Sequence, residues 1–440
     1  FFFKQKTAYE IPKRDWSSDV CSSDLAGLTR RHFLQIGAAA ITAASSRRVL
    51  GANERIGVGF IGYGLIGKRH VLDFREQPDV RCVAVSEVHR GRLDEAKELI
   101  GDGVRGFADF RTLLDDRDVD AVVISTPDPW HALMTMLACS AGKDVYVEKP
   151  LSLFVREGRW MVDVAKRTKR VVQVGTQQRS GLHYQQARQL IRDGQIGKVH
   201  SVRMQAFRNI VPGFGSPPDA DPPPELDWDM FLGPAPARRY NPNRGIYHFR
   251  WFWDYSGGQM TNFGAHHIDI AQWGLGMDDS GPVATEGTAT FHPEMHYEVT
   301  QGCRVTHTYA NGVILVVGQG EKDCPGGVTF VGSKGTIFVD RGKIKSDPED
   351  LIQQSFKESD DKLYVSTNHH QNFLDCIKSR QLPICDVEIG HRSATVCHLG
   401  NIAVRLGRRI QWNPSTEQIV GDDEAAKWVS RPYRAPWTLG

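Results

Sequence analysis

The chain has 440 residues, of which 40% are hydrophobic and 24% charged, a composition typical of a globular protein large enough for two domains. A formal net charge of +2 gives no basis for predicting a nucleic-acid partner or an anionic membrane surface. No apolar run is long enough to span a bilayer. The eight cysteines form no CxxC pair, and no histidines stand at zinc spacing, so neither a disulfide scaffold nor a structural metal site is predicted.

The first 25 residues contain KQKTAYEI and DWSSDVCSSDL, which look like in-frame translations of sequencing-library adapter DNA. Such a stretch resembles a gene-calling artefact rather than protein. We therefore exclude residues 1–25 from fold reasoning, as one would an expression scar.

Residues 26–52 have the pattern of a targeting segment. The run TRRHFL is followed by a short, Ala-rich and mildly apolar stretch at 35–45. This order resembles a twin-arginine export signal, with cleavage between Ala43 and Ala52, and it predicts a periplasmic protein. The alternative is a basic amphipathic helix at a truncated N-terminus. Twin-arginine signals carry proteins that are already folded, often with their cofactor in place.

A glycine-rich turn follows the first predicted strand. The apolar run at 55–61 leads directly into Gly62-Tyr63-Gly64-Leu65-Ile66-Gly67. In a dinucleotide-binding turn the first glycine allows the sharp bend, the second admits the pyrophosphate, and the third lets the helix pack against the strand. The helix N-terminus then offers unpaired N–H groups to the phosphates. An ordinary glycine-rich turn is the alternative, but Glu87, twenty residues after Gly67, ends the next predicted strand and favours dinucleotide binding.

Residues 53–175 predict a doubly wound parallel sheet, that is, a Rossmann domain, because strands alternate with helices. Strands are expected at 55–61, 81–86, 120–125, 144–148 and 170–174, and helices at 65–75, 91–100, 108–115, 131–141 and 155–168. Ligands bind such sheets beyond the carboxyl ends of the strands. Besides the glycine turn, the predicted cofactor-binding residues are therefore Glu87, Ser125, Thr126, Pro127, His131, Glu148, Lys149 and Gln177.

Residues 176–440 predict a second α/β domain with an open, mainly antiparallel sheet, because short strands joined by turns replace the earlier alternation. Helices are expected at 182–193, 367–379 and 388–407, and strands at 198–205, 284–291, 303–309, 313–318, 328–331 and 335–339. One face of this sheet is expected to meet the core, and the other a ligand or a second subunit. The strand pattern leaves both alternatives open; the family resemblance described below implies a homo-oligomer through this sheet.

A Pro- and aromatic-rich loop at 212–255 is too long for a plain connection and is expected to form a rim or lid over a site. Its aromatic residues suit stacking on a sugar ring and suit core or oligomer packing equally well; they are Trp228, Tyr247, Trp251 and Trp253. The tail at 431–440 is expected to lie extended across a surface.

Glu148-Lys149-Pro150 closes the predicted strand at 144–148. A lysine at this place has its ammonium where a nicotinamide ring and a bound hydroxyl would meet. It can stabilise negative charge that develops on the reacting oxygen. A surface lysine is the ordinary alternative, because the tripeptide by itself carries little information, but its place in the ligand crevice favours a catalytic role.

The run GGQMTNFGAHHID at 257–269 reads as a Gly-rich turn that enters a helix. Helical spacing places Asn262, His266 and Asp269 on one face, while His267 points elsewhere and is interpreted as structural. A histidine with a near-neutral pKa suits accepting the proton of an alcohol as its hydride leaves. For His266 a satisfied structural histidine is the alternative. Together with Asn262 and Asp269 it makes a poor ligand set, so no metal site is predicted.

Four motifs in order resemble those of the Gfo/Idh/MocA oxidoreductase family, over about residues 54–440: GFIGYGLIG, Thr-Pro followed by His131, EKP, and N-x-G-x-H-x-x-D. This is the family of glucose–fructose oxidoreductase and inositol dehydrogenase. The resemblance implies NAD(H) or NADP(H) as cofactor, sugars or cyclitols as substrates, and a C-terminal sheet that often builds oligomers. By motif, Lys149 matches the family's catalytic lysine and His266 its catalytic histidine.

Two positions refine what the resemblance implies. Glu87 falls where the family's acidic residue accepts the adenosine ribose hydroxyls, which favours NAD, although Arg90 and Arg92 leave NADP possible. Asn262 stands where many members have an aspartate, and an asparagine can orient a substrate but holds neither a proton nor a countercharge. Arg179, which follows the last Rossmann strand, is predicted to orient the substrate together with Asn262.

Three functions compete. The first is an exported oxidoreductase that acts on a secondary hydroxyl of a sugar or cyclitol, with a tightly bound cofactor that a second substrate regenerates. The second is a redox-neutral NAD-dependent glycoside hydrolase or lyase that works through a transient keto-sugar; Asn262 and the export signal favour it, but residues 257–266 lack the histidine and tyrosine motif of known NAD-dependent glycosidases. The third, a non-catalytic NAD sensor, conflicts with the retention of Lys149 and His266.

Overall fold

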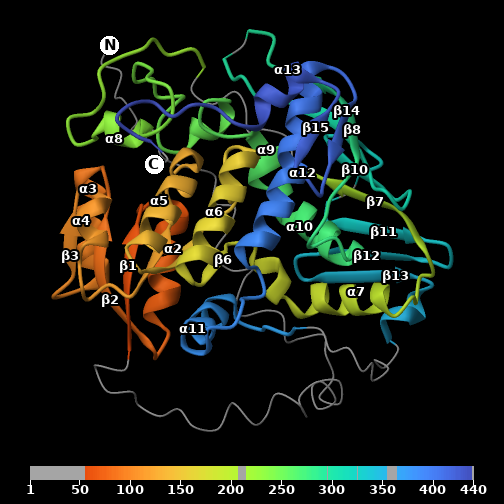
Figure 1. Cartoon of the computed structure of the whole chain (residues 1–440), viewed down its shortest axis with the longest axis horizontal. Helices are drawn as coiled ribbons and strands as arrows, with labels where there is room; N and C mark the ends of the chain where they lie inside the picture. The colour runs from red at the N-terminus through yellow and green to blue at the C-terminus, as the bar shows by residue number, and fades with distance from the viewer. Residues whose placement is uncertain (1–54, 207–214, 295, 325, 354–363, 439–440) are drawn as a thin grey trace, which may run out of the picture. The chain divides into compact units, whose positions relative to one another are not determined.

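The computed structural model describes residues 55–206, 215–294, 296–324, 326–353 and 364–438 (Figure 1). The predicted adapter segment and the predicted twin-arginine signal lie outside the described residues. Across the described ranges, no helix combines the length and the apolarity that a membrane span requires.

Within the described part of the chain, the N-terminal sheet has six parallel strands in the order β3-β2-β1-β4-β5-β6. They are β1 (Ile56–Ile61), β2 (Val80–Ser86), β3 (Arg105–Phe107), β4 (Ala121–Ile124), β5 (Asp144–Val147) and β6 (Val172–Val174). This order is that of the doubly wound dinucleotide-binding fold, whose ligand crevice lies between β1 and β4, so the predicted Rossmann sheet is confirmed. The edge strand β3 was not predicted, because three residues, Arg-Gly-Phe, carry no periodic apolar signal.

Helices cover both faces of this sheet. One face carries α2 (Leu65–Arg75), α3 (Arg90–Ile100) and the late helix α11 (His369–Ser379); the other carries α4 (Phe110–Leu114), α5 (Asp128–Ser140) and α6 (Val155–Thr168). The position of α11 differs from the prediction, which assigned it to the second domain. Its Phe373 is fully buried against Phe74 and Tyr146 of the Rossmann core, so the chain returns to its N-terminal domain near its end (Figure 1).

Within the described residues, the second sheet has nine strands in the order β13-β12-β11-β7-β10-β9-β8-β14-β15. They are β7 (Val199–Gln205), β8 (Ala284–Thr290), β9 (Gly302–Thr308), β10 (Ile314–Gln319), β11 (Val328–Gly332), β12 (Thr336–Asp340), β13 (Lys343–Asp347), β14 (Ile410–Asn413) and β15 (Gln418–Val420). Only β7 and β10 pair in parallel among these strands, so the predicted, mainly antiparallel sheet is confirmed. The strands β13, β14 and β15 were not predicted, since they are short; β13 and β15 are the two edge strands, and β14 lies next to β15.

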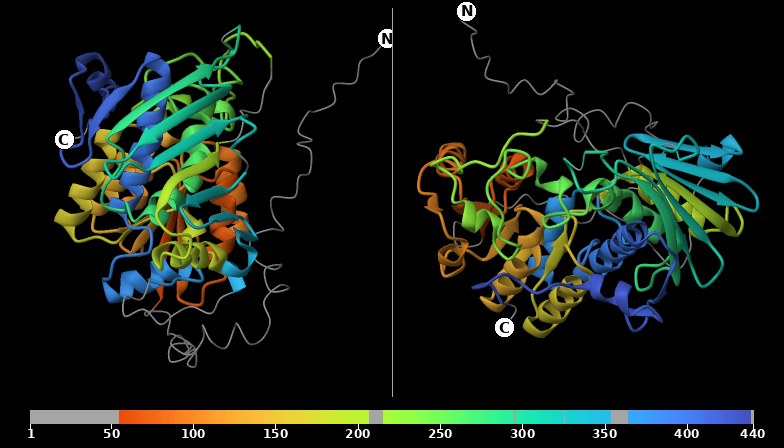
Figure 2. Two further views of the ribbon diagram at one scale, coloured as in Figure 1. Left: turned by 90° about the vertical axis from the view of Figure 1, so that its right-hand side faces the viewer. Right: turned by 90° about the horizontal axis from the view of Figure 1, so that it is seen from above.

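One face of the second sheet packs against α7 (Leu182–Arg192), α10 (Gly264–Leu275) and α12 (Val387–Leu406). Figure 2 (right) shows the strands as a layer with helices on its inner side. The alternate residues of β9 on the other face stay partly exposed. Helix α12 also contributes Val387 and Ala394 to the Rossmann core and thereby ties the two domains together.

The described part of the aromatic loop, residues 215–257 ahead of α9 (Gly258–Asn262), has a hydrophobic cluster of its own. Trp251 is fully buried beside Phe249, Phe252 and Tyr297, so core packing is the correct one of its two predicted roles. The short helix α8 (Trp228–Leu232) lies against the Rossmann domain, where the indole of Trp130 donates a hydrogen bond to a carbonyl of α8.

The C-terminal tail follows α13 (Asp423–Ala426) and crosses the surface of the Rossmann domain, as predicted. Trp437 packs edge-on against Trp130, with 4.7 Å between the ring centroids, and the hydroxyl of Tyr433 donates to Glu157 of α6. The tail therefore covers the same helices that support the ligand crevice.

Candidate active site

The glycine-rich turn between β1 and α2 has the geometry that a dinucleotide phosphate requires. Gly62 has a φ of +90°, which residues with a Cβ rarely adopt, and a Cβ on Gly67 would lie 2.3 Å from the carbonyl oxygen of Gly62. A Cβ on Gly64, by contrast, would meet no atom within 4 Å. Gly64 thus faces open space, and α2 begins there without a side-chain cap, which leaves the first N–H groups of the helix for an anion.

The surroundings of this turn fit a bound NAD. Leu65 and Ile66 are apolar yet 71% and 39% exposed. The hydroxyls of Ser125 and Thr176, which follow β4 and β6, are buried and have no hydrogen-bond partner in the described part of the chain. A dinucleotide along the carboxyl ends of these strands would cover the apolar side chains and hydrogen-bond the hydroxyls.

Two glycine substitutions are expected to have opposite effects. Gly67→Ala should lower the free energy of unfolding by about 1–3 kcal/mol, because its Cβ collides with the backbone of Gly62. Gly64→Ala should change stability little but weaken NAD binding, because its methyl group enters the space of the phosphates. Denaturant unfolding and NADH titration of both variants test this, and equal stability of the two variants would contradict it.

Glu87, directly after β2, reaches back to the glycine turn. Its carboxylate accepts hydrogen bonds from the backbone N–H of Tyr63 at 2.7 Å and from that of His89 at 2.9 Å. The remaining lone pairs of a carboxylate held in this way suit ribose hydroxyls, and its charge would repel a 2′-phosphate. The geometry therefore favours NAD over NADP.

Lys149 lies directly after β5, and its ammonium binds Asn262 of α9. The Nζ atom is 2.8 Å from Oδ1 and 3.1 Å from the backbone oxygen of Asn262. Because an ammonium has three N–H donors, one remains for a substrate oxygen. Burial lowers the pKa of Lys149 to about 8, against the opposing charge of Glu148. The Oδ1 of Asn262 accepts from Lys149 and its Nδ2 donates to Gln259, so Asn262 holds the lysine in position. Its predicted role in orienting the substrate stays a prediction.

The carboxylate of Glu148 holds the loop that carries Lys149 in place through hydrogen bonds. It accepts hydrogen bonds from the backbone N–H of Lys149 at 3.1 Å and from Nε2 of His70 at 2.9 Å. The side chain of Glu148 packs against Gly175, because a Cβ on Gly175 would lie 2.6 Å from Oε1 of Glu148. Burial alone raises the pKa of Glu148, but the hydrogen bond from His70 and the charge of Lys149 bring it below its usual value, so the carboxylate is ionised. Gln177, beyond β6, is half-buried at the rim of the same crevice.

His131 has a different role from the predicted contact with the cofactor. It is 1% exposed, and its ring nitrogens lie 2.7 Å from the carbonyl oxygen of Pro150 and 2.8 Å from that of Thr126. The ring therefore spans the two loops that follow β4 and β5. We correct the prediction: His131 is a positioning residue that sets the distance between the Thr126-Pro127 loop and Lys149.

His266 lies near enough to Lys149 for the charge of the lysine to lower its pKa. The helix predicted for this run is divided at Phe263 into α9 and α10. His266 is buried, and its Nδ1 has no hydrogen-bond partner among the described residues. Burial and the nearby charges of Lys149 and Arg341 hold the pKa of His266 well below its ordinary value, so the imidazole is neutral at pH 7. His267 instead contacts the backbone oxygen of Gln205 at 3.1 Å, which confirms its predicted structural role.

Two arginines that the sequence did not single out add positive charge to this site. The charges of Arg250 and Arg341 both lower the pKa of Lys149, and Arg250 is held over the ring of Tyr247 at 4.1 Å. Asp128 provides the opposite charge and accepts a hydrogen bond from Ser256 at 2.5 Å. Neither arginine belongs to a motif, so only the fold reveals its place.

Arg179 is not available to a substrate, contrary to its predicted role. It is 1% exposed, and its guanidinium donates to both carboxylate oxygens of Asp269 and to both of Asp278, at 2.7–3.0 Å. Asp269 also accepts a hydrogen bond from Ser393 of α12. Arg179 therefore ties its own segment to α10 and to Asp278, and Asp269 carries the network on to α12. Removing one partner of such a buried network leaves an uncompensated charge, so the role of Arg179 is structural.

Comparisons with known proteins match both parts of the chain to one oxidoreductase family. A family model described as "Oxidoreductase family, NAD-binding Rossmann fold" matches residues 56–176, and one described as "Oxidoreductase family, C-terminal alpha/beta domain" matches residues 206–439. Myo-inositol 2-dehydrogenase of Thermotoga maritima is 25% identical over 356 residues, which are 80% of this chain and 93% of that protein. Glycosyl hydrolase family 109 protein 1 of Shewanella sp. (strain MR-4) is 32% identical over 168 residues, only 34% of this chain and 37% of that protein.

Among solved structures, the WlbA dehydrogenase from Bordetella pertussis in complex with NADH and UDP-GlcNAcA shares the fold. The TM-score is 0.61 at 18% identity, over 82% of this chain and 99% of that one. This likeness shows the shared fold, and the glycine turn at 62–67 lies within the residues that the NAD-binding family model matches.

Proposed function

Because the chain belongs to the Gfo/Idh/MocA family of NAD-dependent oxidoreductases, we propose that it oxidises a secondary hydroxyl of a sugar or cyclitol. The observation that carries this proposal is that the site combines Lys149, whose pKa is lowered to about 8, with His266, whose imidazole is neutral. Lys149 keeps one N–H donor free of Asn262. His266 has a buried Nδ1 without a partner among the described residues, and the charge of Lys149 helps to lower its pKa. The dehydrogenase relatives support a carbohydrate substrate.

The two residues divide the chemistry between them. Bound NAD⁺ supplies the hydride acceptor for the carbon that bears the hydroxyl. As the C–H bond breaks, the neutral imidazole of His266 takes the hydroxyl proton, and the ammonium of Lys149 donates a hydrogen bond to the oxygen, on which negative charge develops. Asn262 and Glu148 keep the lysine in position through the contacts described above.

We further propose that the protein acts in the periplasm with its cofactor tightly bound. The support is the twin-arginine pattern at 26–52, which lies outside the described residues. Since free NAD is scarce outside the cytoplasm, a second substrate would have to reoxidise the cofactor in the same site. We also propose a homo-oligomer through the second sheet, because the outward residues of β9 alternate with its buried ones and leave a strand face uncovered in one chain.

The second candidate function is redox-neutral cleavage of a glycoside, and the similarity to a family 109 glycosyl hydrolase favours it. Transient oxidation to a keto-sugar would acidify the neighbouring C–H bond, so that loss of this proton expels the aglycone by elimination. Water would then add to the resulting double bond, and reduction of the carbonyl by the same cofactor would restore the hydroxyl, with no net redox change. The same Lys149 and His266 would serve the redox half of that cycle.

Assays without added NAD distinguish these functions. The mature protein is purified, its bound nucleotide is identified, and it is offered sugars, cyclitols and aryl glycosides. Turnover of free sugars that requires an electron-accepting second substrate supports the oxidoreductase. Glycoside cleavage without net NADH supports the second candidate, and binding without turnover of any substrate contradicts both.

Asn262→Asp tests the arrangement around the lysine. A carboxylate 2.8 Å from the ammonium favours its charged form and should raise the pKa of Lys149 by about 1–3 units. Loss of the ammonium proton of Lys149 is expected to lower kcat/KM above about pH 8. In Asn262→Asp this decrease should begin at a higher pH. Asn262→Ala, which adds no charge, is the control and should leave the fall at about pH 8 or below; coincident pH profiles of the two variants would contradict the prediction.

A further inference from the structure

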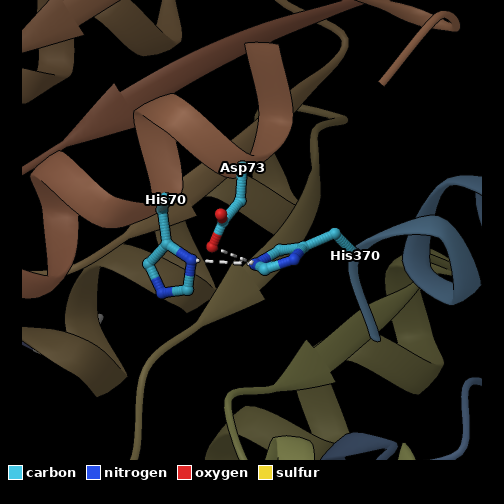
Figure 3. Close-up of side chains that lie close together, drawn as sticks. All are labelled: His70, Asp73 and His370. Carbon is cyan, nitrogen blue, oxygen red and sulfur yellow. Dashed lines mark hydrogen bonds and ion pairs between the residues drawn. The ribbon is translucent and has the colours of Figure 1, made fainter. Parts of the chain in front are cut away.

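Three potential metal ligands meet where α2 and α11 touch, on the face of the Rossmann sheet that carries these helices (Figure 3). His70 and Asp73 stand three residues apart on α2 and therefore share one side of the helix. Their partner is His370, whose Nε2 lies 3.0 Å from Nδ1 of His70 and 4.0 Å from Oδ2 of Asp73. One ligand atom from each residue lies within 4.8 Å of the other two.

We propose that His70, Asp73 and His370 bind a divalent transition-metal ion, with Zn²⁺ as the ion that this ligand set fits best. Zn²⁺ takes imidazole nitrogen and carboxylate oxygen at about 2.0–2.2 Å in tetrahedral geometry, so two of its ligand atoms lie about 3.4 Å apart. The observed separations of 3.0 Å and 4.0 Å lie on either side of that value. Three protein ligands leave the fourth position to water or to a small ligand.

A second carboxylate orients His70 for this task. Oε1 of Glu148 lies 2.9 Å from Nε2 of His70; with the hydrogen on Nε2, which the carboxylate accepts, the lone pair of Nδ1 is directed toward His370. A carboxylate on the far nitrogen of a ligating histidine fixes its tautomer and makes it a better ligand. His370 is also held in place, since its ring stacks on Tyr146 and packs edge-on against Phe74 at 4.8 Å.

The local charges suit a dication. Asp73 and Glu148 contribute two carboxylates, and Arg69 contributes one positive charge at 2.9 Å from Asp73. A carboxylate has about four lone-pair sites, so Asp73 can bind Arg69 and the metal together.

Through Glu148, the proposed site connects to the loop of Lys149, because the same carboxylate accepts from His70 and from the backbone N–H of Lys149. A metal there would join α11 to α2, the helix that starts at the cofactor turn. The inference does not rest on the proposed function, and its test reads metal binding rather than turnover.

The test uses the mature chain with its bound nucleotide, purified without a polyhistidine tag and stripped of metal with a chelator. Zn²⁺ affinity is measured by competition with a chromophoric chelator, and Co²⁺ is added to observe the visible bands of a tetrahedral site. We expect one equivalent to bind. His370→Gln and Asp73→Asn should each weaken binding at least about tenfold.

His200→Gln, which removes an exposed histidine on β7, is the matched control and should bind as the unmodified chain does. Circular dichroism and retained nucleotide check the fold of every variant; if His370→Gln does not fold, Asp73→Asn carries the test. The proposal is overturned if the unmodified chain binds less than one saturable equivalent, or if Asp73→Asn and His200→Gln bind alike. Either result would mean that the 3.0 Å contact between His70 and His370 is an N–H···N hydrogen bond and that no metal binds there.

Discussion

Replacing Lys149 with alanine is expected to lower kcat about 10²–10³-fold, the usual cost of removing one donor that stabilises charge on a reacting oxygen. NAD should remain bound, because the glycine turn, Glu87 and the helix N-terminus that hold it are untouched. Single-turnover reduction of the bound cofactor, followed by NADH absorbance, measures the effect directly. A rate unchanged from that of the native protein would remove Lys149 from the mechanism.

The pH dependence gives a second and independent measurement of the same residue. The protonated lysine donates the hydrogen bond, and it predominates below its pKa of about 8. As the pH rises through that value the ammonium is lost, so kcat/KM should fall about tenfold per pH unit above it. In Lys149→Arg the guanidinium stays charged, and the fall near pH 8 should disappear whatever activity remains. A fall that persists in this variant would assign the titration to another group.

Replacing His266 with alanine is expected to lower kcat about 10²–10⁴-fold, the usual contribution of a general base. Because the pKa of His266 lies well below its ordinary value, the base is already neutral at pH 6. The native profile should therefore be flat between about pH 6 and the fall assigned to Lys149. Added imidazole should restore part of the rate in His266→Ala if the lost function is proton transfer.

His266→Gln serves as the control for packing, since it fills most of the same buried volume without a titratable nitrogen. It should be as inactive as His266→Ala but closer to the native stability. If His266→Gln keeps native turnover, His266 is a structural histidine, which is the alternative to a general base that the sequence left open.

The corrections to the predicted site share a physical origin. Arg179 and His131 stand where a ligand contact is expected from strand ends alone, but both are 1% exposed and are bound by carboxylates or backbone carbonyls. A position in the sequence locates a residue at the crevice; it does not say which way the side chain turns. That choice depends on Asp269 and Pro150, which lie 90 and 19 residues further along the chain.

The amino-acid sequence by itself determined the alternation of strands and helices, the glycine turn, Glu87, and the places of Lys149 and His266. These features are local, because hydrophobic periodicity and a required backbone conformation act over a few residues. Only the tertiary structure decided that Asn262 holds Lys149, that α11 joins the Rossmann core, and that His370 meets His70 from 300 residues away. Such contacts depend on how distant surfaces pack, and no short pattern in the chain encodes that packing.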